Sequence, residues 1–257
     1  MQVSKYNANG NDFIIFHTDT QAPRAELAKR LCDRHEGVGA DGLIVVLPSG
    51  SKEYDFKWQF YNSDGSEASM CGNGSRACAH YAFVNALAKA QMRFLTGAGV
   101  ISASVEKDIV EVELTTPKKI REPFEKMGFV WHSYDTGVPH LITIVDDLLK
   151  FDLEVARKMR YDYNANINFM TMHSDKTIYV RTYERGVENE TMACGTGVAA
   201  CFCTAYELKM TGERAKVLPR SGEELFVRYE GKSVFFKGRV SLTFTANLSK
   251  ELNEIFV

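Results

Sequence analysis

Two short stretches, MCGNGSRA at residues 70–77 and MACGTGVA at residues 192–199, decide how this chain is expected to fold. Each is a Cys-Gly-x-Gly turn that runs directly into an apolar, Ala-rich segment, and these segments predict helices at residues 77–88 and 198–208. The surroundings repeat as well, because YNSDG at 61–65 precedes the first turn and YERG at 183–186 precedes the second. Strand-like segments joined by Gly-containing turns follow each predicted helix. The repeat therefore predicts a duplicated unit with one active site between its two halves.

The cysteine of each turn, Cys71 or Cys194, stands at the start of a predicted helix. Backbone N–H groups without helical partners and the positive end of the helix dipole favour a thiolate there. The glycines that follow let a ligand approach the backbone, and the exposed amides suit an anion such as a carboxylate. Two such turns facing each other could remove a proton from one face of a carbon atom and return one to the other. The alternative is two buried structural cysteines, but the repetition favours a catalytic pair.

Composition narrows the class of protein. The chain has 257 residues, 45% of them hydrophobic and 25% charged, which are ordinary values for a globular protein. A net charge of −2 gives no electrostatic case for nucleic acid or for an anionic membrane surface. Residues 1–16 lack a signal-peptide pattern and no apolar run reaches membrane-spanning length, so a cytoplasmic protein with six free thiols is expected. None of the cysteines has Cys-x-x-Cys spacing, and no metal site is predicted.

The remaining pattern predicts α/β architecture. A strand hairpin around residues 9–11 opens the chain, and a helix is expected from Pro23 to about Arg34. In the second half, a strand is expected at residues 166–172. The sequence GVGADG at 37–42 matches a nucleotide-binding loop in letters, but a helix precedes it and a strand follows, which is the reverse of the dinucleotide-binding order. A boundary near residue 116 divides the chain into 1–116, joined by the tail 247–257, and 117–246.

Three further cysteines are expected to pack in the interior. Cys78 and Cys201 each follow a turn cysteine by seven residues, and two helical turns place them on the same face of the predicted helix. Cys32 shows no partner signal and is also expected in the core.

Several polar residues are candidates on position alone. His140 follows a proline at a predicted strand start, and Glu184 with Arg185 occupies the repeat position that matches Asn62. Asn11, Asn62 and Asn166 are further candidates, but asparagine is also a common turn residue for conformational reasons. Nothing local to these residues establishes a ligand contact.

Taken together, the residues resemble those of the diaminopimelate epimerases. The resemblance runs from NGNDF at 9–13 through GADG at 39–42, CGNG at 71–74 and YERG at 183–186 to ACGTG at 193–197, in the order found in that family. It implies two similar α/β domains, each a mixed sheet rolled around a central helix, with the site in the cleft between them. It also implies a homodimeric enzyme without a cofactor that converts LL- to meso-2,6-diaminopimelate, a diamino dicarboxylate on the route to lysine and peptidoglycan precursors.

The same resemblance implies roles for individual residues. Cys71 and Cys194 would transfer the proton, one as thiolate and one as thiol, and His140 and Glu184 would help set their protonation. The residues implied to bind substrate are Asn11, Asn62, Gly72, Asn73, Asn166, Arg185, Gly195 and Thr196. Their groups differ in kind: the residues that follow each cysteine offer amides to the reacting carboxylate, and Asn62, Asn166 and Arg185 hold the far end.

Two departures from the family pattern and two rival functions remain. Val138 stands where the family usually has Asn before Pro-His, and Phe244 stands where a tyrosine at the dimer contact is common. The nearest rival is another cofactor-independent racemase, acting on proline, hydroxyproline or histidine, but Arg185 with three asparagines favours a substrate with a second polar end. From a different class, a thiol- or metal-based binding or redox module lacks the expected Cys-x-x-Cys spacing.

Overall fold

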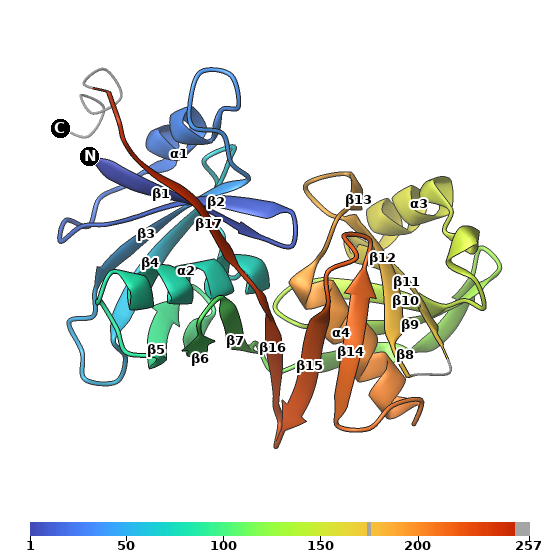
Figure 1. Ribbon diagram of the computed structural model, residues 1–257. Helices are drawn as coiled ribbons and strands as arrows, with labels where there is room; N and C mark the ends of the chain where they lie inside the picture. Colours follow the sequence, from blue (N-terminus) through green and yellow to red (C-terminus); the bar gives the residue numbers. More distant parts are fainter. Residues whose placement is uncertain (174–175, 250–257) are drawn as a thin grey trace. The chain divides into compact units, whose positions relative to one another are not determined.

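The computed structural model describes residues 1–173 and 176–249. Contacts divide the described residues into two units: unit 1 is Met1–Val112 with residues 239–249, and unit 2 is Glu113–Gly238. The sequence-based boundaries differ from this division mainly in 239–246, which was expected in the second domain and which the structure joins to unit 1. Of the tail expected to join the first domain, residues 250–257 lie outside the described residues. Figure 1 labels the helices and strands of both units.

Unit 1 opens with an antiparallel hairpin of β1 (Gln2–Ala8) and β2 (Asn11–His17). Its two turn residues, Asn9 and Gly10, both have positive φ, at 59° and 83°, which the tight two-residue hairpin turn requires and which Asn-Gly adopts readily. β2 pairs in parallel with β3 (Gly42–Pro48), and α1 (Ala25–Cys32) makes the crossover between them. β3 then pairs antiparallel with β4 (Phe56–Asn62). The strand β17 (Ser241–Asn247) pairs antiparallel with β1, which is why the end of the chain belongs to unit 1.

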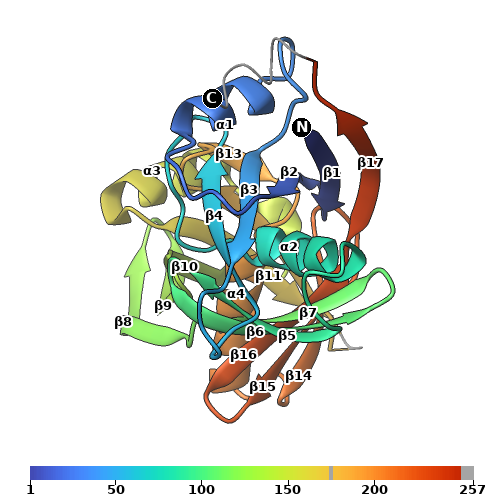
Figure 2. The same cartoon turned by 90° about the vertical axis from the view of Figure 1, so that its left-hand side faces the viewer.

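The β3 strand is covered on both faces, because all its residues up to Leu47 are buried. Leu43, Val45 and Leu47 pack in one cluster with Leu27 and Leu31 of α1. The helix α2 (Gly72–Val84) contacts β1, β2 and β3 and also β6 (Gly99–Glu106). It lies between these strands (Figure 2) and buries nearly all its residues as far as Ala82. The antiparallel strands β5 (Gln91–Thr96), β6 and β7 (Ile109–Leu114) complete the sheet around it.

Unit 2 repeats this order. β9 (Phe129–Asp135) pairs antiparallel with β10 (Pro139–Ile144), β10 pairs in parallel with β11 (Asn166–Met172), and β11 pairs antiparallel with β12 (Ile178–Glu184). The crossover between β10 and β11 contains η1 (Leu148–Lys150) and α3 (Leu153–Tyr163). Outside this core are β8 (Lys118–Lys126), β13 (Asn189–Thr191), β14 (Arg214–Pro219), β15 (Leu225–Glu230) and β16 (Ser233–Arg239). The duplication expected from the two cysteine turns is therefore present in the strand pairings.

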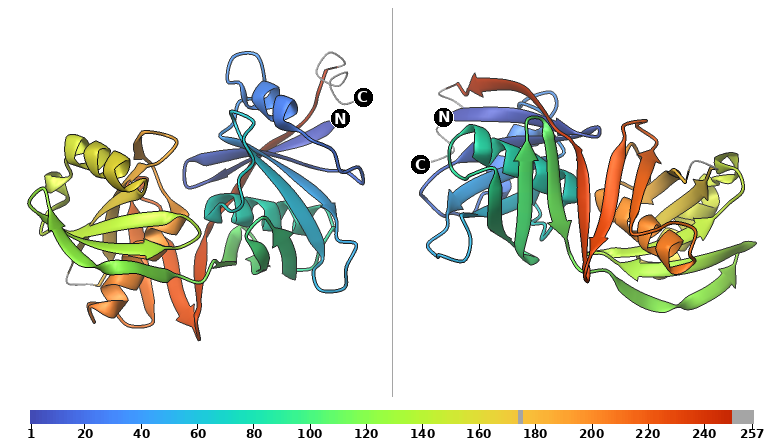
Figure 3. Two further views of the ribbon diagram at one scale, coloured as in Figure 1. Left: turned by 180° about the vertical axis from the view of Figure 1, so that it is seen from behind. Right: turned by 60° about the horizontal axis from the view of Figure 1, so that its bottom comes forward.

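The central helix of unit 2 is α4 (Gly195–Glu207), which contacts β9 to β12 and also β14 and β15 (Figure 3). Alternation along β11 separates the two faces of its sheet. Ile167 and Phe169 pack in the cluster with Ala156 and Met159 of α3, whereas Asn166 and Asn168 lie on the opposite face. Each unit is thus a mixed sheet rolled around one buried helix, as expected. None of the helices in residues 1–173 and 176–249 has the length and apolar character needed to cross a membrane.

Candidate active site

The strand register of unit 1 brings Asn11 and Asn62 to one edge of its sheet. β2 and β3 are parallel and both begin at this edge, whereas β4 is antiparallel and ends there, with Asn62 opposite Gly42. The helix α2 begins at the same edge, because a side-chain carbon added to Gly74 would lie 3.4 Å from atoms of both Phe13 and Ile44. The Asn62 side chain is exposed and donates to Ser66 Oγ at 2.9 Å.

Cys71 is the N-cap residue of α2 and is half-buried. Its Sγ accepts the N–H of Gly74 at 3.4 Å, and its S–H is directed at Asn11 Oδ1 at 3.7 Å. The first contact stabilises a thiolate and the second stabilises a thiol, so the sulfur has a partner in either protonation state. The amides of Gly72 and Asn73 are the first two of the helix, where no helical carbonyl can accept them. They are therefore suited to an anionic ligand beside the sulfur.

The register of unit 2 produces the matching arrangement. His140 lies opposite Asn166 across β10 and β11, and the pairing of Ile167 with Tyr183 places Asn166 beside Glu184. Asn166 Oδ1 accepts the backbone N–H of Arg185 at 2.7 Å. The side chain of Glu184 is half-buried at the end of β12. The structure thus brings together, within unit 2, four residues that the sequence placed far apart: His140, Asn166, Glu184 and Arg185.

Asn168 fixes the orientation of the His140 ring. Its Nδ2 donates to Leu141 O at 3.0 Å and to His140 Nδ1 at 3.1 Å, while its Oδ1 accepts from Thr182 Oγ1 at 2.9 Å. A carbonyl oxygen can only accept, so Leu141 O fixes which end of the amide faces the ring. Asn166 Nδ2 also lies 3.4 Å from His140 Nε2, but the Asn168 contact with Nδ1 is shorter. His140 Nδ1 is therefore taken as the acceptor, with the proton of the neutral ring on Nε2. From there it donates to Thr196 Oγ1 at 3.0 Å.

The Thr196 hydroxyl connects His140 to the second cysteine. Cys194 is the buried N-cap residue of α4, and its Sγ lies 3.4 Å from Thr196 Oγ1. Because the hydroxyl accepts from His140, its own hydrogen is available to the sulfur. Complete burial, together with the charge of Arg185, lowers the pKa of His140 to about 3. The ring is therefore neutral at ordinary pH and acts on Cys194 through hydrogen bonds.

Sequence reasoning missed Asn168, Thr182 and Gly197 of unit 2. A side-chain carbon on Gly197 would lie 2.5 Å from Asn168 Oδ1 and 3.4 Å from His140 Cε1, so the glycine makes room for this hydrogen-bonded group. One signal was available for Asn168, because it follows Asn166 by two residues in a predicted strand and therefore shares its face. The contact of Thr182 depends on pairing between strands and leaves no local sequence signal.

The other four cysteines are buried, and burial raises the pKa of each thiol. For Cys32 and for Cys203 the pKa rises to about 12. A buried thiol that stays protonated is a poor nucleophile, which fits the packing role expected for Cys32, Cys78 and Cys201. Among the residues that the structure describes, no group of three or more His, Cys, Asp or Glu side chains could hold a metal ion.

A duplicated unit, in which a mixed sheet is rolled around one central helix, defines the class of two-unit α/β folds to which the chain belongs. A crystal structure of a phenazine biosynthesis protein of the PhzF family from Enterococcus faecalis has this fold, with a TM-score of 0.74 over 96% of this chain and 99% of that one. At 13% sequence identity, that likeness shows the fold alone.

The family model of diaminopimelate epimerase matches residues 3–120 and 132–243. A protein named diaminopimelate epimerase from a Nitratiruptor species is 57% identical over 244 residues, which cover 95% of this chain and 97% of that protein. Another of the same name, from Campylobacter lari, is 50% identical over 96% of this chain and 98% of its own length. The chain belongs to the diaminopimelate epimerase family, which confirms the resemblance seen in the sequence.

Proposed function

We propose that this chain is an isomerase that converts LL- to meso-2,6-diaminopimelate without a cofactor, with Cys71 and Cys194 as the proton-transfer residues. The observation that carries the proposal is the repeated half-site. In each unit a cysteine occupies the N-cap position of a buried helix whose first amides are suited to a carboxylate. Membership of the diaminopimelate epimerase family supports the substrate.

In the proposed reaction one cysteine, as thiolate, takes the α-proton and the other, as thiol, donates a proton to the opposite face. The carbanion formed between these steps places charge on the substrate carboxylate. Gly72, Asn73, Gly195 and Thr196 offer backbone amides to that charge. A helix terminus contributes about 2 kcal/mol at most in a partly buried geometry. Fixed hydrogen-bond donors in a site that excludes water must supply the larger part.

Four polar residues give the proposed site selectivity for a substrate with two polar ends. Asn11 Oδ1 lies 3.7 Å from Cys71 Sγ, which supports its assignment to the reacting end. Asn62 is assigned to the far amino-acid end together with Asn166 and Arg185, which are already hydrogen-bonded to each other. Proline and hydroxyproline have no second amino-acid end to occupy these groups, so this set disfavours the rival racemases.

His140 and Glu184 are proposed to control protonation of the cysteines. The support for His140 is its contact with Thr196, which in turn contacts Cys194. Glu184 is proposed from its place beside Asn166 at the same sheet edge.

A homodimer in the cytoplasm is proposed as the working form. The strand β17 pairs with β1, and its side chains are largely exposed on both faces of the strand. Leu242 and Phe244 of β17 are each 43% exposed, and a register shift in the pairing with β1 lies between them. A second copy of the chain that covers this strand would remove both side chains from water. Light scattering of the wild type and of Phe244→Glu tests this: a dimer that dissociates in the variant is expected, and a monomeric wild type contradicts it.

Deuterium incorporation tests the reaction. Wild-type enzyme incubated with LL-diaminopimelate in D2O is expected to form meso product that carries deuterium at the inverted carbon, while early recovered substrate carries little. A thiol that gives up solvent deuterium on one face while a second thiolate takes hydrogen from the other produces this asymmetry. Cys71→Ala and Cys194→Ala should each abolish inversion. Product that keeps the substrate's own hydrogen would exclude the two-cysteine mechanism.

A further inference from the structure

We propose that Asp41 is a positioning residue that holds the Asn11 side-chain amide so that its oxygen, and not its nitrogen, faces Cys71. Asp41 lies in the segment GVGADG that the proposed reaction does not otherwise use. The inference rests on the proposed role of Asn11 beside Cys71, and it adds a residue that need not touch the substrate.

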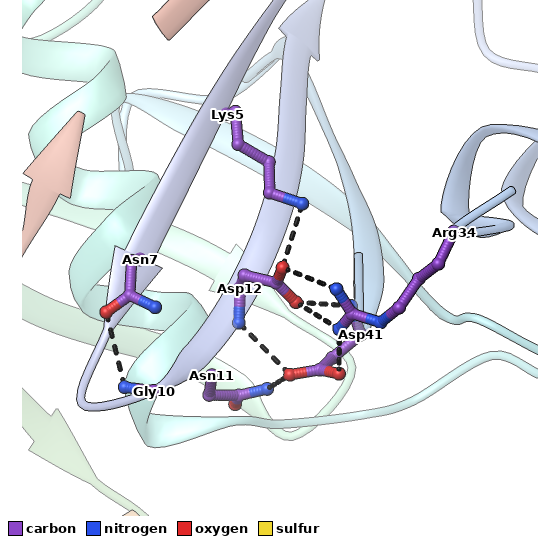
Figure 4. Close-up of polar contacts among 7 residues, drawn as sticks. All are labelled: Lys5, Asn7, Gly10, Asn11, Asp12, Arg34 and Asp41. Carbon is purple, nitrogen blue, oxygen red and sulfur yellow. Dashed lines mark hydrogen bonds and ion pairs between the residues drawn. The ribbon is translucent and has the colours of Figure 1, made fainter. Parts of the chain in front are cut away.

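Asp41 makes two contacts with the start of β2. Its Oδ2 accepts from Asn11 Nδ2 at 2.7 Å and from the backbone N–H of Asp12 at 3.1 Å (Figure 4). In return, the backbone N–H of Asp41 donates to Asp12 Oδ1 at 2.8 Å. The start of β2 and the segment that leads into β3 are therefore held to each other by side chain and main chain together.

The carboxylate decides the orientation of the amide. An ionised carboxylate only accepts hydrogen bonds, so the NH₂ end of Asn11 must face it and Oδ1 must face the opposite way. In that direction Oδ1 meets the S–H of Cys71 at 3.7 Å and Nδ2 of Asn73 at 3.5 Å. The amide of Asn73 is fixed in turn, because its Oδ1 accepts from Arg76 Nη2 at 2.7 Å. Asp41 orients the amide of Asn11, and Arg76 orients the amide of Asn73. The oxygen of Asn11 therefore faces the NH₂ group of Asn73 beside Cys71.

Asp41 belongs to a group of four charged side chains. Arg34 Nη2 lies 2.9 Å from Asp41 Oδ1 and also 2.9 Å from Asp12 Oδ1, and Lys5 Nζ lies 2.8 Å from Asp12 Oδ2. The group of Lys5, Arg34, Asp12 and Asp41 contains two positive and two negative side chains. Arg34 is 56% exposed, so its ion pairs contribute little stability individually. The ion pair uses Oδ1 of Asp41 whereas Asn11 uses Oδ2, so the two contacts can be removed separately.

A reversed Asn11 amide would alter the site in two ways. Its NH₂ group would face the sulfur as a donor and would no longer accept the S–H of Cys71. It would also turn two donors, Asn11 Nδ2 and Asn73 Nδ2, towards each other. Loss of the Asp41 acceptor therefore permits an arrangement in which Cys71 is less suited to hold and deliver a proton.

A double-mutant cycle tests the inference. Asp41→Ala is expected to lower kcat/KM about tenfold, the effect of losing one hydrogen bond to a charged group. If Asp41 acts through Asn11, then Asn11→Ala combined with Asp41→Ala should be no slower than Asn11→Ala alone. Asp41→Asn retains an acceptor oxygen for Asn11 but loses the charge, so it should restore most of the activity. Arg34→Gln is the matched control for the ion pair, and its kcat/KM should stay within about twofold of the wild type.

The results that would overturn this inference differ from those that would overturn the proposed function. Multiplicative losses in the cycle, or an Asp41→Asn variant as slow as Asp41→Ala, overturn the positioning role while leaving the reaction intact. Full activity of Asn11→Ala overturns the role of Asn11 and this inference with it. Wild-type protein that does not turn over diaminopimelate contradicts the proposed function instead, and the orientation is then tested without turnover.

NMR tests the orientation of the Asn11 amide without turnover. The protein is labelled with ¹⁵N-asparagine, and the Asn11 side-chain signal is assigned by its absence from the Asn11→Ala spectrum. One slowly exchanging amide proton is expected, and it should also be present in Arg34→Gln. Two rapidly exchanging protons would overturn the inference, and this holds even if Asp41→Ala does not fold.

Discussion

At the scale of single residues, the two cysteines have unlike hydrogen-bond partners although the units that carry them are similar. Cys71 faces the carbonyl oxygen of Asn11, an acceptor, whereas Cys194 faces the hydroxyl of Thr196, whose hydrogen His140 leaves available. The difference depends on which end each neighbouring amide presents. Asp41 decides this for Asn11, and Leu141 O decides it for Asn168.

Replacing Asn168 with aspartate tests the arrangement around His140. A carboxylate in this place accepts from His140 Nδ1–H, so the ring proton moves from Nε2 to Nδ1. Nε2 then accepts the Thr196 hydroxyl hydrogen and withdraws it from Cys194. We expect Asn168→Asp to lower kcat by about 10- to 100-fold, because the lost bond is to a charged sulfur. The ¹⁵N signals of His140 report the tautomer. Unchanged signals together with an unchanged kcat would contradict the claim that Asn168 fixes the tautomer of His140. Thr182→Val, which removes only a donor to Asn168, is the milder control.

Selective alkylation tests the division of the cysteines. Because burial raises the pKa of the thiols of Cys32, Cys78, Cys201 and Cys203, these four remain protonated at pH 8. Brief treatment of the native protein with iodoacetamide should modify Cys71 first, since it is half-buried, and Cys194 next. Peptide mapping by mass spectrometry gives the order. Modification of Cys78 ahead of Cys71 in folded protein would contradict the assignment, and urea-unfolded protein, in which all six react, is the control.

At the scale of elements, the sequence predicted the strands more closely than the helix starts. The strand 166–172 was predicted with the bounds that β11 has, and the helix-before-strand order around the glycine-rich segment is confirmed. Both central helices begin at the residue after the cysteine, at Gly72 and Gly195, several residues before the expected starts. Glycine has low helix propensity, so the first turn gave no helical signal. β8 was not expected, because its charged sequence KKIREPFEK lacks the apolar alternation typical of a strand.

The candidate site could be predicted where chemistry follows from a single residue type and not where it follows from register. Cys71 and Cys194 were found from their turns, and the family resemblance supplied His140 and Glu184. Asp41 and Thr182 contact residues of neighbouring strands, so only the observed pairing identifies them. Asn168 could be predicted only as far as sharing a strand face with Asn166, and its contact with His140 comes from the structure.

The start of α4 gives a prediction at this scale. In an unobstructed helix, Gly197→Ala would add stability because alanine has the higher helix propensity. Here the added carbon would lie 2.5 Å from Asn168 Oδ1, so Asn168 must move and the helix or β11 must shift. We expect a net loss of about 1–3 kcal/mol and a lower Tm, with a fall in kcat as His140 loses its fixed orientation. Gly212→Ala, where no atom lies within 4 Å of the added carbon, is the matched control. An equal or higher Tm for Gly197→Ala would contradict the crowding.

At the scale of the whole molecule, burial of His140 links stability to pH. The pKa of this histidine is lowered to about 3 in the folded protein, first by burial and then by Arg185, against an ordinary value of 6.5. Between pH 6.5 and about pH 3, His140 therefore binds a proton in the unfolded chain but not in the folded chain. Stability is complete above pH 6.5, falls as the pH decreases below 6.5, and stops falling near the folded pKa. Burial also lowers the pKa of His80 and of His132, which adds to the same trend.

Asp12 acts in a separate and more acidic range. Burial raises its pKa, but hydrogen bonds from Arg34 and Lys5 outweigh that effect and bring it down to about 2 from 3.8. Its contribution is present above about pH 3.8 and is lost as the pH falls through 2. At pH 5 the histidines alone are therefore expected to reduce stability.

Urea denaturation at pH 7.5 and pH 5.0 measures the share of His140. Burial of His140 should make the free energy of unfolding of the wild type about 2 kcal/mol lower at pH 5.0 than at pH 7.5. This difference follows from pH 5.0 lying about 1.5 units below the pKa of histidine in the unfolded chain. His140→Gln cannot be protonated, so its stability should fall by that much less between the two conditions, whatever its absolute stability. Arg34→Gln, which changes the group around Asp12, should show the wild-type difference because Asp12 remains ionised at both pH values. An equal pH dependence for wild type and His140→Gln would mean that the folded protein accepts a proton on His140. The imidazole would then act on Cys194 as a cation and not through the neutral hydrogen bonds derived from Asn168.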